Sequence, residues 1–316
     1  MKLENDPGID RLDSVYIIGN GVIGKALAVA LSLNGKNVTI LRGSVDGAET
    51  FHKRIQVETG NGTWEADIRI SSISCFERLN GIILLTNKSF GNRRLAEKLR
   101  SKVGQSPIVF LQNGLNIEDS FTELGFTNLY RCVLLATSQA AAEDKVRFRL
   151  VAASPIGVIN GSEKMLTNIV EQLTTSIFSF RAEPDIQPVI WKKVISNCLF
   201  NSICPLLETD NGVFRRNEAA LEIGKKVIRE CLSVARESGI QLTEDEVLEN
   251  VLNISALSDG QKISTYQDIL NGRETEIDSM NLAIADAAER LGIPVPITSL
   301  LGTLTKTKSE IFRGVE

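Results

Sequence analysis

Three glycines between an apolar run and a helical stretch limit what the start of this chain can fold into. Gly19, Gly21 and Gly24 form a G-x-G-x-x-G pattern after the strand-like run 14–18 and at the beginning of an expected helix. In this context the first glycine permits a tight turn, the second lets the backbone approach a pyrophosphate, and the third allows close helix–strand packing. The helix N-terminus would offer free amide donors to the phosphates. The pattern predicts a dinucleotide-binding unit, and the alternative is a glycine-rich turn without a ligand. The expected phosphate-binding turn consists of Gly19, Asn20, Gly21, Val22, Ile23 and Gly24.

The end of the second expected strand distinguishes between two dinucleotides. An NAD site usually has Asp or Glu there, about 20 residues beyond the glycines, to bind the ribose hydroxyls. This chain has Arg42 after the run 37–41, followed closely by Ser44. A guanidinium can bind a 2′-phosphate, and a serine adds a hydroxyl donor. We therefore predict NADPH as the cofactor, with an unliganded surface arginine as the alternative.

Apolar runs and helical segments alternate through the first half of the chain. Continuous apolar runs, as expected for parallel strands covered on both faces, occupy 81–86, 107–112 and 131–136, with a helix at 92–103. The order of strands and helices is typical of a doubly wound sheet. We also expect strands at 54–59 and 64–70 joined by a turn, an antiparallel pair formed by 146–152 and 156–160, and a helix over 162–177.

Around residues 181–188 two prolines and the loss of periodicity indicate a connection between domains. Beyond it only helical periodicity is found, in 189–204, 213–238, 243–258, 264–271 and 276–291, and then in a tail helix from about residue 298. We predict an α/β fold, with an N-terminal Rossmann-type dinucleotide-binding domain over 14–182 and an all-helical C-terminal domain over 183–316. Residues 1–13 are expected to be a short N-terminal extension.

One of these helices carries a polar stripe on an otherwise apolar surface. Lys193, Asn197 and Asn201 stand four residues apart, so they share one face of the helix over 190–204. A helix this apolar is normally buried, and a buried ammonium or amide needs a partner. Two interpretations follow. The stripe is either a network that fixes helix packing, or a carbonyl or carboxylate site with one proton donor.

Composition excludes several classes of function. The formal net charge of −4 argues against a general nucleic-acid binder, and no run approaches the ~20 apolar residues that a membrane span needs. The five cysteines include no C-x-x-C pair, and His52 is the single histidine, on an expected exposed strand face, so we predict no metal site. Free buried thiols and the absence of a targeting pattern lead us to expect a cytoplasmic protein.

Five motifs carry a resemblance to a known family. They are the Gly19 turn, Leu111-Gln112-Asn113-Gly114, the segment 191–201 (WKKVISNCLFN), Asn211-Gly212 and the segment 263–278 (ISTYQDILNGRETEID). On these motifs the chain resembles the ketopantoate reductases (2-dehydropantoate 2-reductases) over nearly its whole length after residue 14. The resemblance implies NADPH-dependent reduction of 2-dehydropantoate to pantoate in pantothenate and coenzyme A biosynthesis. It also implies a small-molecule 2-keto acid as substrate, with a homodimer as an open expectation.

The resemblance also implies roles for single residues. Lys193 would be the catalytic proton donor, assisted by Glu276. The implied substrate-binding residues are Asn113, Asn197, Asn201, Asn211 and Ser264, and the implied cofactor contacts beyond the turn and Arg42 are Lys88, Asn113, Ala142 and Glu276. Reduction of a ketone places negative charge on oxygen, so a cation among fixed amides would lower that barrier.

Some of these residues have an alternative interpretation. Ser264 begins a stretch with capping-box spacing, so it could serve as a helix cap. An acid such as Glu276 is favoured at a helix start by the helix dipole alone. Lys88 could be a solvated lysine at the end of a strand.

The chain departs from the family pattern at Asn116, in 137–142 and at Gln261. These departures keep open two further hypotheses, a family member that reduces another 2-keto acid and a non-catalytic NADPH-binding protein. The presence of both Lys193 and Glu276 argues against the last of these.

Overall fold

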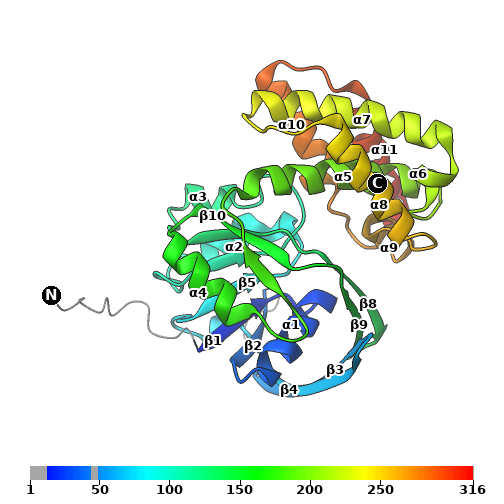
Figure 1. Ribbon diagram of the computed structural model, residues 1–316. Coiled ribbons are helices and arrows are strands. Elements are labelled where there is room, and N and C mark those ends of the chain that lie inside the picture. Colours follow the sequence, from blue (N-terminus) through cyan, green and yellow to red (C-terminus); the bar gives the residue numbers. More distant parts are fainter. Residues whose placement is uncertain (1–12, 44–48, 316) are drawn as a thin grey trace. The chain divides into compact units, whose positions relative to one another are not determined.

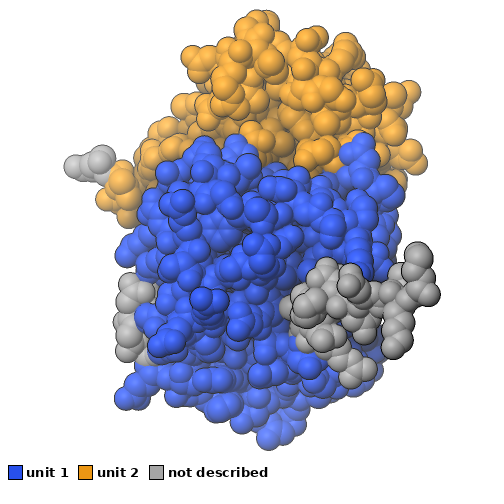
Figure 2. Space-filling model, turned by 90° about the vertical axis from the view of Figure 1, so that its left-hand side faces the viewer, with its two compact units in different colours: residues 1–112, 118–186 blue, residues 113–117, 187–316 orange. Residues whose placement is uncertain are grey.

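The computed structural model describes residues 13–43 and 49–315, so the predicted extension before residue 13 and Ser44 lie outside the described residues. The chain forms two compact units, coloured blue and orange in Figure 2. The sheet unit comprises Met1–Gln112 and Glu118–Ile186, and the helical unit comprises Asn113–Ile117 and Gln187–Glu316. The short segment 113–117, expected in the first domain, therefore groups with the helical unit.

The described part of the sheet unit contains one sheet of eleven strands in the order β11-β10-β7-β6-β5-β1-β2-β4-β3-β9-β8. The strands are β1 (Ser14–Ile18), β2 (Asn37–Arg42), β3 (Phe51–Thr59), β4 (Gly62–Ser72), β5 (Ile82–Leu85), β6 (Ile108–Phe110), β7 (Leu129–Cys132), β8 (Ala136–Ala142), β9 (Lys145–Leu150), β10 (Ser154–Asn160) and β11 (Phe180–Ala182). The six strands from β4 to β7 run parallel, in the order of a Rossmann sheet. The predicted fold class is confirmed.

The helices of the sheet unit are α1 (Val22–Leu33), α2 (Asn92–Leu99), α3 (Asp119–Glu123) and α4 (Glu163–Leu173), with short 3-10 turns η1 (Ile73–Cys75) and η2 (Ser89–Gly91). Helix α1 is enclosed: β3, β4, β8 and β9 all contact it, and Figure 1 shows these strands curving around it. Residues 26–31 (ALAVAL) are all buried. The absence of a polar face on this segment explains why the helix lies inside the core cluster and not on the surface of the sheet.

The predicted antiparallel pair of 146–152 with 156–160 is wrong. Strand β9 instead pairs with β8 and β3, and β10 pairs with β7 and β11. The antiparallel partner of β9 is β8, the segment 136–142, whose sequence ATSQAAA lacks a strand-like apolar alternation. That missing signal is the reason β8 could not be anticipated.

The helical unit contains α5 (Ile186–Leu206, whose first residue belongs to the sheet unit), α6 (Val213–Arg216), α7 (Glu218–Glu237), α8 (Glu244–Leu257), α9 (Ser264–Leu270), η3 (Ile277–Ser279), α10 (Asn281–Leu291) and α11 (Pro296–Arg313). One predicted helix, over 213–238, is interrupted. Asn217 is extended (φ −131°) and its side chain caps α7 by accepting a hydrogen bond from the Ala220 amide at 2.9 Å. The cap turns one periodic stretch into two helices.

The expected environment of the cysteines is correct for four of the five. Cys132, Cys198, Cys204 and Cys231 are buried and form no disulfide, whereas Cys75 is exposed at the end of η1. The prediction for Cys75 is wrong: this residue lies in η1, after β4 has ended at Ser72, and its side chain is exposed there. Burial raises the pKa of the Cys204 thiol to about 12, and the charge of Asp210 adds to the effect. Within the described residues, no helix is both long and apolar enough to cross a membrane.

The close packing at Gly24 gives a stability prediction. A Cβ at this position would overlap the Gly19 carbonyl oxygen and would lie 2.8 Å from Thr86 Oγ1. Gly24→Ala should lower the free energy of unfolding by about 1–3 kcal/mol, because the backbone carbonyl cannot yield as a flexible side chain would. Urea unfolding followed by circular dichroism measures the loss. Gly60→Ala is the matched control, since nothing lies within 4 Å of its added Cβ; equal losses in both variants would contradict the packing argument.

Candidate functional site

The glycine turn of the sheet unit is held against the end of a neighbouring strand. Gly19 has φ +124°, and a Cβ there would come within 2.7 Å of both the Asn87 amide nitrogen and Thr86 Oγ1. The backbone amides of Thr86 and Asn87 donate to the Ile18 carbonyl at 2.9 and 3.1 Å. Thr86 Oγ1 also donates to the carbonyls of Ile18 and Gly19, at 3.2 and 3.3 Å. The carboxyl ends of β1 and β5 therefore fix this turn together.

The start of α1 fits an anionic group. Its N-cap is Gly21, no side chain among the described residues caps the helix, and the first turn contains no acidic residue. A Cβ at Gly21 would meet nothing within 4 Å, in contrast to Gly19 and Gly24. The missing side chain thus leaves open space beside uncapped amide donors, an arrangement that suits a phosphate.

Arg42 ends β2, where the 2′-phosphate contact is predicted. Its Nη2 atom donates to the Glu49 carbonyl at 3.3 Å, and its guanidinium lies 5.2 Å from the centroid of the Phe51 ring. Its Nε atom has no hydrogen-bond partner among the described residues. The guanidinium is thus placed by stacking and one backbone contact, without a carboxylate partner in the described part of the chain.

Two further predicted cofactor contacts lie elsewhere in the sheet unit. Lys88 is half-buried in the extended backbone between β5 and η2. Ala142 is exposed at the end of the edge strand β8, just before the turn that contains Asp144. Lys25 of α1 reaches this turn, with Nζ 3.3 Å from Asp144 Oδ1. The β8–β9 hairpin is thereby tied to the first half of α1, and the roles of Lys88 and Ala142 stay predictions.

In the helical unit the polar stripe lies on α5, as the sequence indicates. Lys193 and Asn197 are half-buried, and Asn201 is 1% exposed. The intervening apolar residues are buried on the other faces, namely Val194, Ile195, Cys198, Leu199 and Phe200. Lys192, next in sequence to Lys193, instead forms an ion pair with Glu246 at 3.8 Å. Adjacent lysines on this helix therefore serve different surroundings.

The amide of Asn201 joins α5 to the start of α9. Its Oδ1 atom accepts hydrogen bonds from Ser264 Oγ and from the Thr265 amide, both at 3.3 Å, while its Nδ2 atom donates to the Asn197 carbonyl at 3.1 Å. Ser264 is not the N-cap of α9: that residue is Ile263, whose own side chain makes no capping hydrogen bond. Ser264 is the first residue of α9, so it starts a helix as the alternative interpretation expected, but it does not cap that helix. Its hydroxyl binds Asn201, so the packing network and the predicted site share these two residues.

Asn197 differs from Asn201 in its contacts. Its side chain makes no hydrogen bond to any residue within 13–43 or 49–315, and it is only half-buried. Of the two asparagines on the stripe, Asn197 is thus the one whose amide is available to a ligand.

The predicted residues Asn113 and Glu276 belong to neighbouring segments of the helical unit. A Cβ at Gly114 (φ +116°) would lie 2.5 Å from the Ser279 Cβ, and the Leu115 amide donates to the Ser279 carbonyl at 2.8 Å. The Ser279 amide and hydroxyl in turn donate to the Glu276 carbonyl, at 3.0 and 2.9 Å. Glu276 is 7% exposed.

A fully buried asparagine connects the Glu276 turn with α5. Asn281 Nδ2 donates to the Cys198 carbonyl at 3.2 Å. Because Asn281 begins α10 directly after η3, this bond holds the turn close to the stripe helix. Asn113, Glu276 and the stripe are therefore carried by contiguous parts of one unit.

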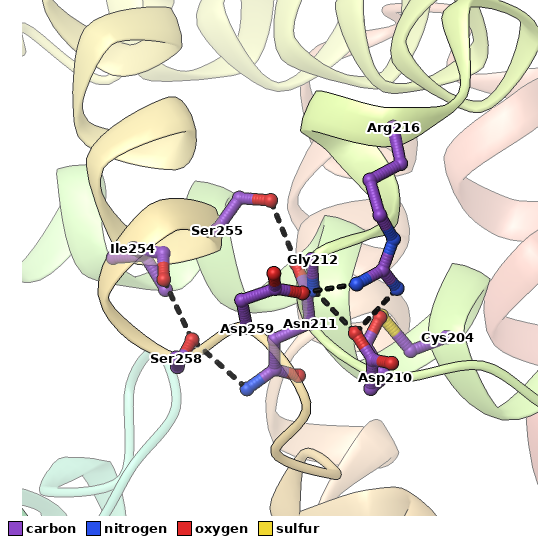
Figure 3. Close-up of polar contacts among 9 residues, drawn as sticks. All are labelled: Cys204, Asp210, Asn211, Gly212, Arg216, Ile254, Ser255, Ser258 and Asp259. Atoms are coloured by element: carbon purple, nitrogen blue, oxygen red, sulfur yellow. Dashed lines mark hydrogen bonds and ion pairs between the residues drawn. The ribbon is translucent and has the colours of Figure 1, made fainter.

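Asn211 lies in the turn after α5 and is 5% exposed (Figure 3). Its backbone amide donates to the Gln261 backbone carbonyl at 2.9 Å, and its side-chain Nδ2 atom donates to Ser258 Oγ at 3.2 Å. Residues 258–265 thus contact Asn211 at one end and Asn201 at the other. The structure brings the predicted asparagines of the helical unit onto one connected framework.

Sequence reasoning missed three residues that organise these sites. Thr86 donates to carbonyls of the glycine turn, Ser279 packs against Gly114, and Asn281 donates to the carbonyl of Cys198. A polar residue directly after a buried strand, as at Thr86, was the available signal. Ser279 and Asn281 give no such signal, because their roles depend on contacts with distant segments. No group of three His, Cys, Asp or Glu residues suited to a metal ion occurs in the described part of the chain.

Comparison with known proteins adds family information to this geometry. The family model described as ketopantoate reductase PanE/ApbA matches residues 15–159, and the model of its C-terminal domain matches residues 185–309. A 2-dehydropantoate 2-reductase of Streptococcus pyogenes serotype M3 is 24% identical over 302 residues, covering 94% of this chain and 98% of that protein. One from Pyrococcus abyssi is 25% identical over 301 residues, with the same shares covered.

Solved structures share the fold. A PanE/ApbA family ketopantoate reductase from Ralstonia eutropha JMP134 superposes with a TM-score of 0.82 at 22% identity, covering 95% of this chain and 99% of the other. D-mandelate dehydrogenase with NADH and anilino(oxo)acetate gives 0.81 at 21% identity and the same coverage. A dimeric ketopantoate reductase from Staphylococcus aureus gives 0.80 at 18% identity, again with that coverage.

The two family models together span most of the chain, across both the sheet unit and the helical unit. The chain therefore belongs to the ketopantoate reductase family of NAD(P)H-dependent oxidoreductases.

Proposed function

We propose that this protein reduces 2-dehydropantoate to pantoate with NADPH, in the synthesis of pantothenate and coenzyme A. The observation that carries the proposal is the stripe on α5, with Lys193 and the uncommitted amide of Asn197 on one face and Asn201 anchored to Ser264. Family membership supports reduction of a 2-keto acid, and the curated relatives named 2-dehydropantoate 2-reductase support this particular acid.

The glycine turn and the start of α1 would hold the pyrophosphate of the cofactor, and Arg42 would bind its 2′-phosphate. When bound, the reduced nicotinamide supplies a hydride to the keto carbon. Open space at Gly21 and the absence of a described carboxylate partner for Arg42 support this assignment. Lys88, Asn113, Ala142 and Glu276 are the further cofactor contacts that we propose.

Lys193 would deliver the proton. As the keto carbon gains the hydride, its oxygen gains negative charge and takes a proton from the Lys193 ammonium, which yields the hydroxyl group of the product. The resulting neutral amine regains a proton from solvent. Glu276, in the turn connected to α5 through Asn281, would favour the charged form of the lysine and help to place it.

Neutral amides suit the rest of this substrate, because they can bind a carboxylate and a hydroxyl without changing charge near neutral pH. Asn197 and Asn211 each keep hydrogen-bonding capacity unused by the described residues. Asn201 and Ser264 are already hydrogen-bonded to each other. They would therefore both contact the substrate and hold α5 and α9 together at the site. Asn113 would act beside Glu276.

A second candidate keeps the chemistry and changes the acid. The chain departs from the family pattern at Asn116, in 137–142 and at Gln261, and one similar fold is that of a D-mandelate dehydrogenase. The backbone carbonyl of Gln261 accepts a hydrogen bond from the backbone amide of Asn211, so this departure lies next to a proposed substrate residue. A homodimer is also part of the proposal, supported by the dimeric enzyme of S. aureus.

A panel assay tests the substrate. Purified protein is mixed with NADPH and, in separate reactions, 2-dehydropantoate, 2-oxoisovalerate, pyruvate and phenylglyoxylate, and NADPH oxidation is followed by absorbance. We expect the highest kcat/KM with 2-dehydropantoate. A higher value with another acid would establish the second candidate. NADPH binding without turnover of any acid would refute both enzymatic proposals.

Removal of the proposed proton donor should affect the rate more than binding. Lys193→Ala is expected to lower kcat by about 10²- to 10⁴-fold, the usual contribution of a positioned acid. The Kd for NADPH, measured by fluorescence titration, should change little. Lys192→Ala is the matched control, because this neighbour on the same helix is paired with Glu246. Full activity of Lys193→Ala, or equal losses in the two variants, would eliminate the assignment.

The cofactor preference has its own test. Arg42→Ala should raise KM for NADPH by about ten- to a hundredfold, since hydrogen bonds to a charged group contribute about 1.5–3 kcal/mol, and should leave KM for NADH nearly unchanged. Arg54→Ala, which removes an exposed arginine paired with Glu65 in the same unit, is the control. A similar rise with both cofactors in Arg42→Ala would contradict a 2′-phosphate contact.

A further inference from the structure

Asn211 combines burial with an unused acceptor. It is 5% exposed, yet its Oδ1 atom has no hydrogen-bond partner among the described residues. Leaving a buried acceptor unpaired costs about 1–3 kcal/mol, so the surrounding structure must hold the side chain in this state. In many turns a short rotation would return such an amide to water. The contacts around Asn211 show what prevents that rotation.

Three hydrogen bonds fix Asn211 directly. Its backbone amide donates to the Gln261 backbone carbonyl at 2.9 Å, and its backbone carbonyl accepts from Ser255 Oγ at 2.8 Å. Its side-chain Nδ2 atom donates to Ser258 Oγ at 3.2 Å. Ser258 Oγ in turn donates to the Ile254 carbonyl, so its lone pair is directed to the asparagine (Figure 3). These bonds use the backbone groups of Asn211 and the donor end of its amide. Of the polar atoms of Asn211, Oδ1 is the one without a hydrogen-bond partner in the described part of the chain.

Asp210, the residue before Asn211, is held by charge. Arg216 on α6 binds Asp210 with Nη2 2.7 Å from Oδ1, and its Nη1 atom binds Asp259, which follows α8 (Figure 3). The Gly212 amide also donates to Asp210 Oδ1, at 2.8 Å. Burial alone would raise the pKa of Asp210, but the Gly212 amide and the Arg216 guanidinium bring this pKa below its ordinary value. Asp210 is therefore charged at any neutral assay pH.

Gly212 is required by the same network. A Cβ at this position would overlap Asp259 Oδ1 and lie against Arg216 Nη1. Arg216 thus links Asp210, the residue before Asn211, to Asp259, just after α8, and its guanidinium lies against Gly212. The bridge spans the same two segments that Ser255 and Ser258 join through Asn211.

We propose that Arg216 is a positioning residue for the 2-keto acid, acting through Asn211 by keeping its Oδ1 atom oriented toward the substrate's hydroxyl donor. The proposal rests on the proposed function for the nature of the ligand. An isolated exposed ion pair contributes little to stability. Arg216 instead bridges two carboxylates on either side of one buried asparagine, so its removal releases the Asn211 turn and not merely a surface contact. A displacement of about 1 Å in a binding group is enough to reduce turnover substantially.

Steady-state kinetics test the effect on substrate. Arg216→Ala should raise KM for 2-dehydropantoate, the one acid of the panel with a hydroxyl donor, by about tenfold, with KM for NADPH unchanged and kcat reduced less than KM is raised. Arg216→Lys should recover part of the loss, because an ammonium keeps the charge but cannot form two fixed guanidinium contacts. Arg229→Ala is the matched control: Arg229 forms a similarly exposed pair with Glu244, between α7 and α8 and away from Asn211.

A double-mutant cycle separates positioning from general destabilisation. If Arg216 acts through Asn211, Arg216→Ala should have little further effect on KM in a protein that already carries Asn211→Ala. An equal effect of Arg216→Ala in both backgrounds would overturn the proposal. So would an unchanged KM in Arg216→Ala itself.

Hydrogen exchange gives a readout that does not depend on the substrate. In Arg216→Ala the amides of Asn211 and Gly212, which donate to Gln261 and Asp210, should exchange at least about tenfold faster, with the peptides of α7 unchanged. Unchanged exchange at these two amides would refute the positioning role even if no 2-keto acid of the panel is reduced. Faster exchange without any turnover would instead leave the positioning of Asn211 supported and refute the proposed function.

Discussion

The hydrogen bonds that the Asn201 side chain accepts from Ser264 and Thr265 are the interaction on which the helical unit's candidate site depends. A polar side chain on a buried helix needs partners, and Asn201 obtains them from the start of a helix more than sixty residues later. The same contact places residues 258–265, whose other end binds Asn211. A requirement of packing therefore also arranges the groups that we propose to meet the substrate.

In the sheet unit, a glycine and a threonine together form the turn before α1. A strained turn at Gly19 is tolerated because Thr86, at the end of the adjacent parallel strand, binds two of its carbonyls. The result is a helix start whose amides carry no side-chain cap. We assign this helix start to the cofactor. In the helical unit, we assign to the substrate the side-chain amide of Asn197 and the Oδ1 atom of Asn211, which have no hydrogen-bond partner among the described residues.

Much of the fold could be predicted because its signals are local. Continuous apolar runs marked the parallel strands, and the stripe of Lys193, Asn197 and Asn201 marked α5 as a buried helix with one polar face. The failures also have local causes. Strand β8 has an alanine-rich sequence without alternation, and Ser264 has the spacing of a cap although its hydroxyl binds Asn201. A capping pattern describes what a serine can do with its own backbone, and it contains no information about a competing amide on another helix.

By itself the sequence determined the Rossmann-type sheet, the helical second half, the dinucleotide turn and the identity of the residues proposed for catalysis. The sheet, the helices and the turn follow from periodicity and glycine spacing, which act over a few residues. The residues proposed for catalysis follow from the resemblance of short motifs to the ketopantoate reductases. Only the tertiary structure decided that segment 113–117 packs on Ser279 and that Arg216 bridges two carboxylates around Asn211. It also decided that the Asn201 side chain forms hydrogen bonds within the described residues, whereas the Asn197 side chain forms none there. Hydrogen bonds and ion pairs of this kind join groups far apart in the chain, so they exist only once packing has brought those groups within reach.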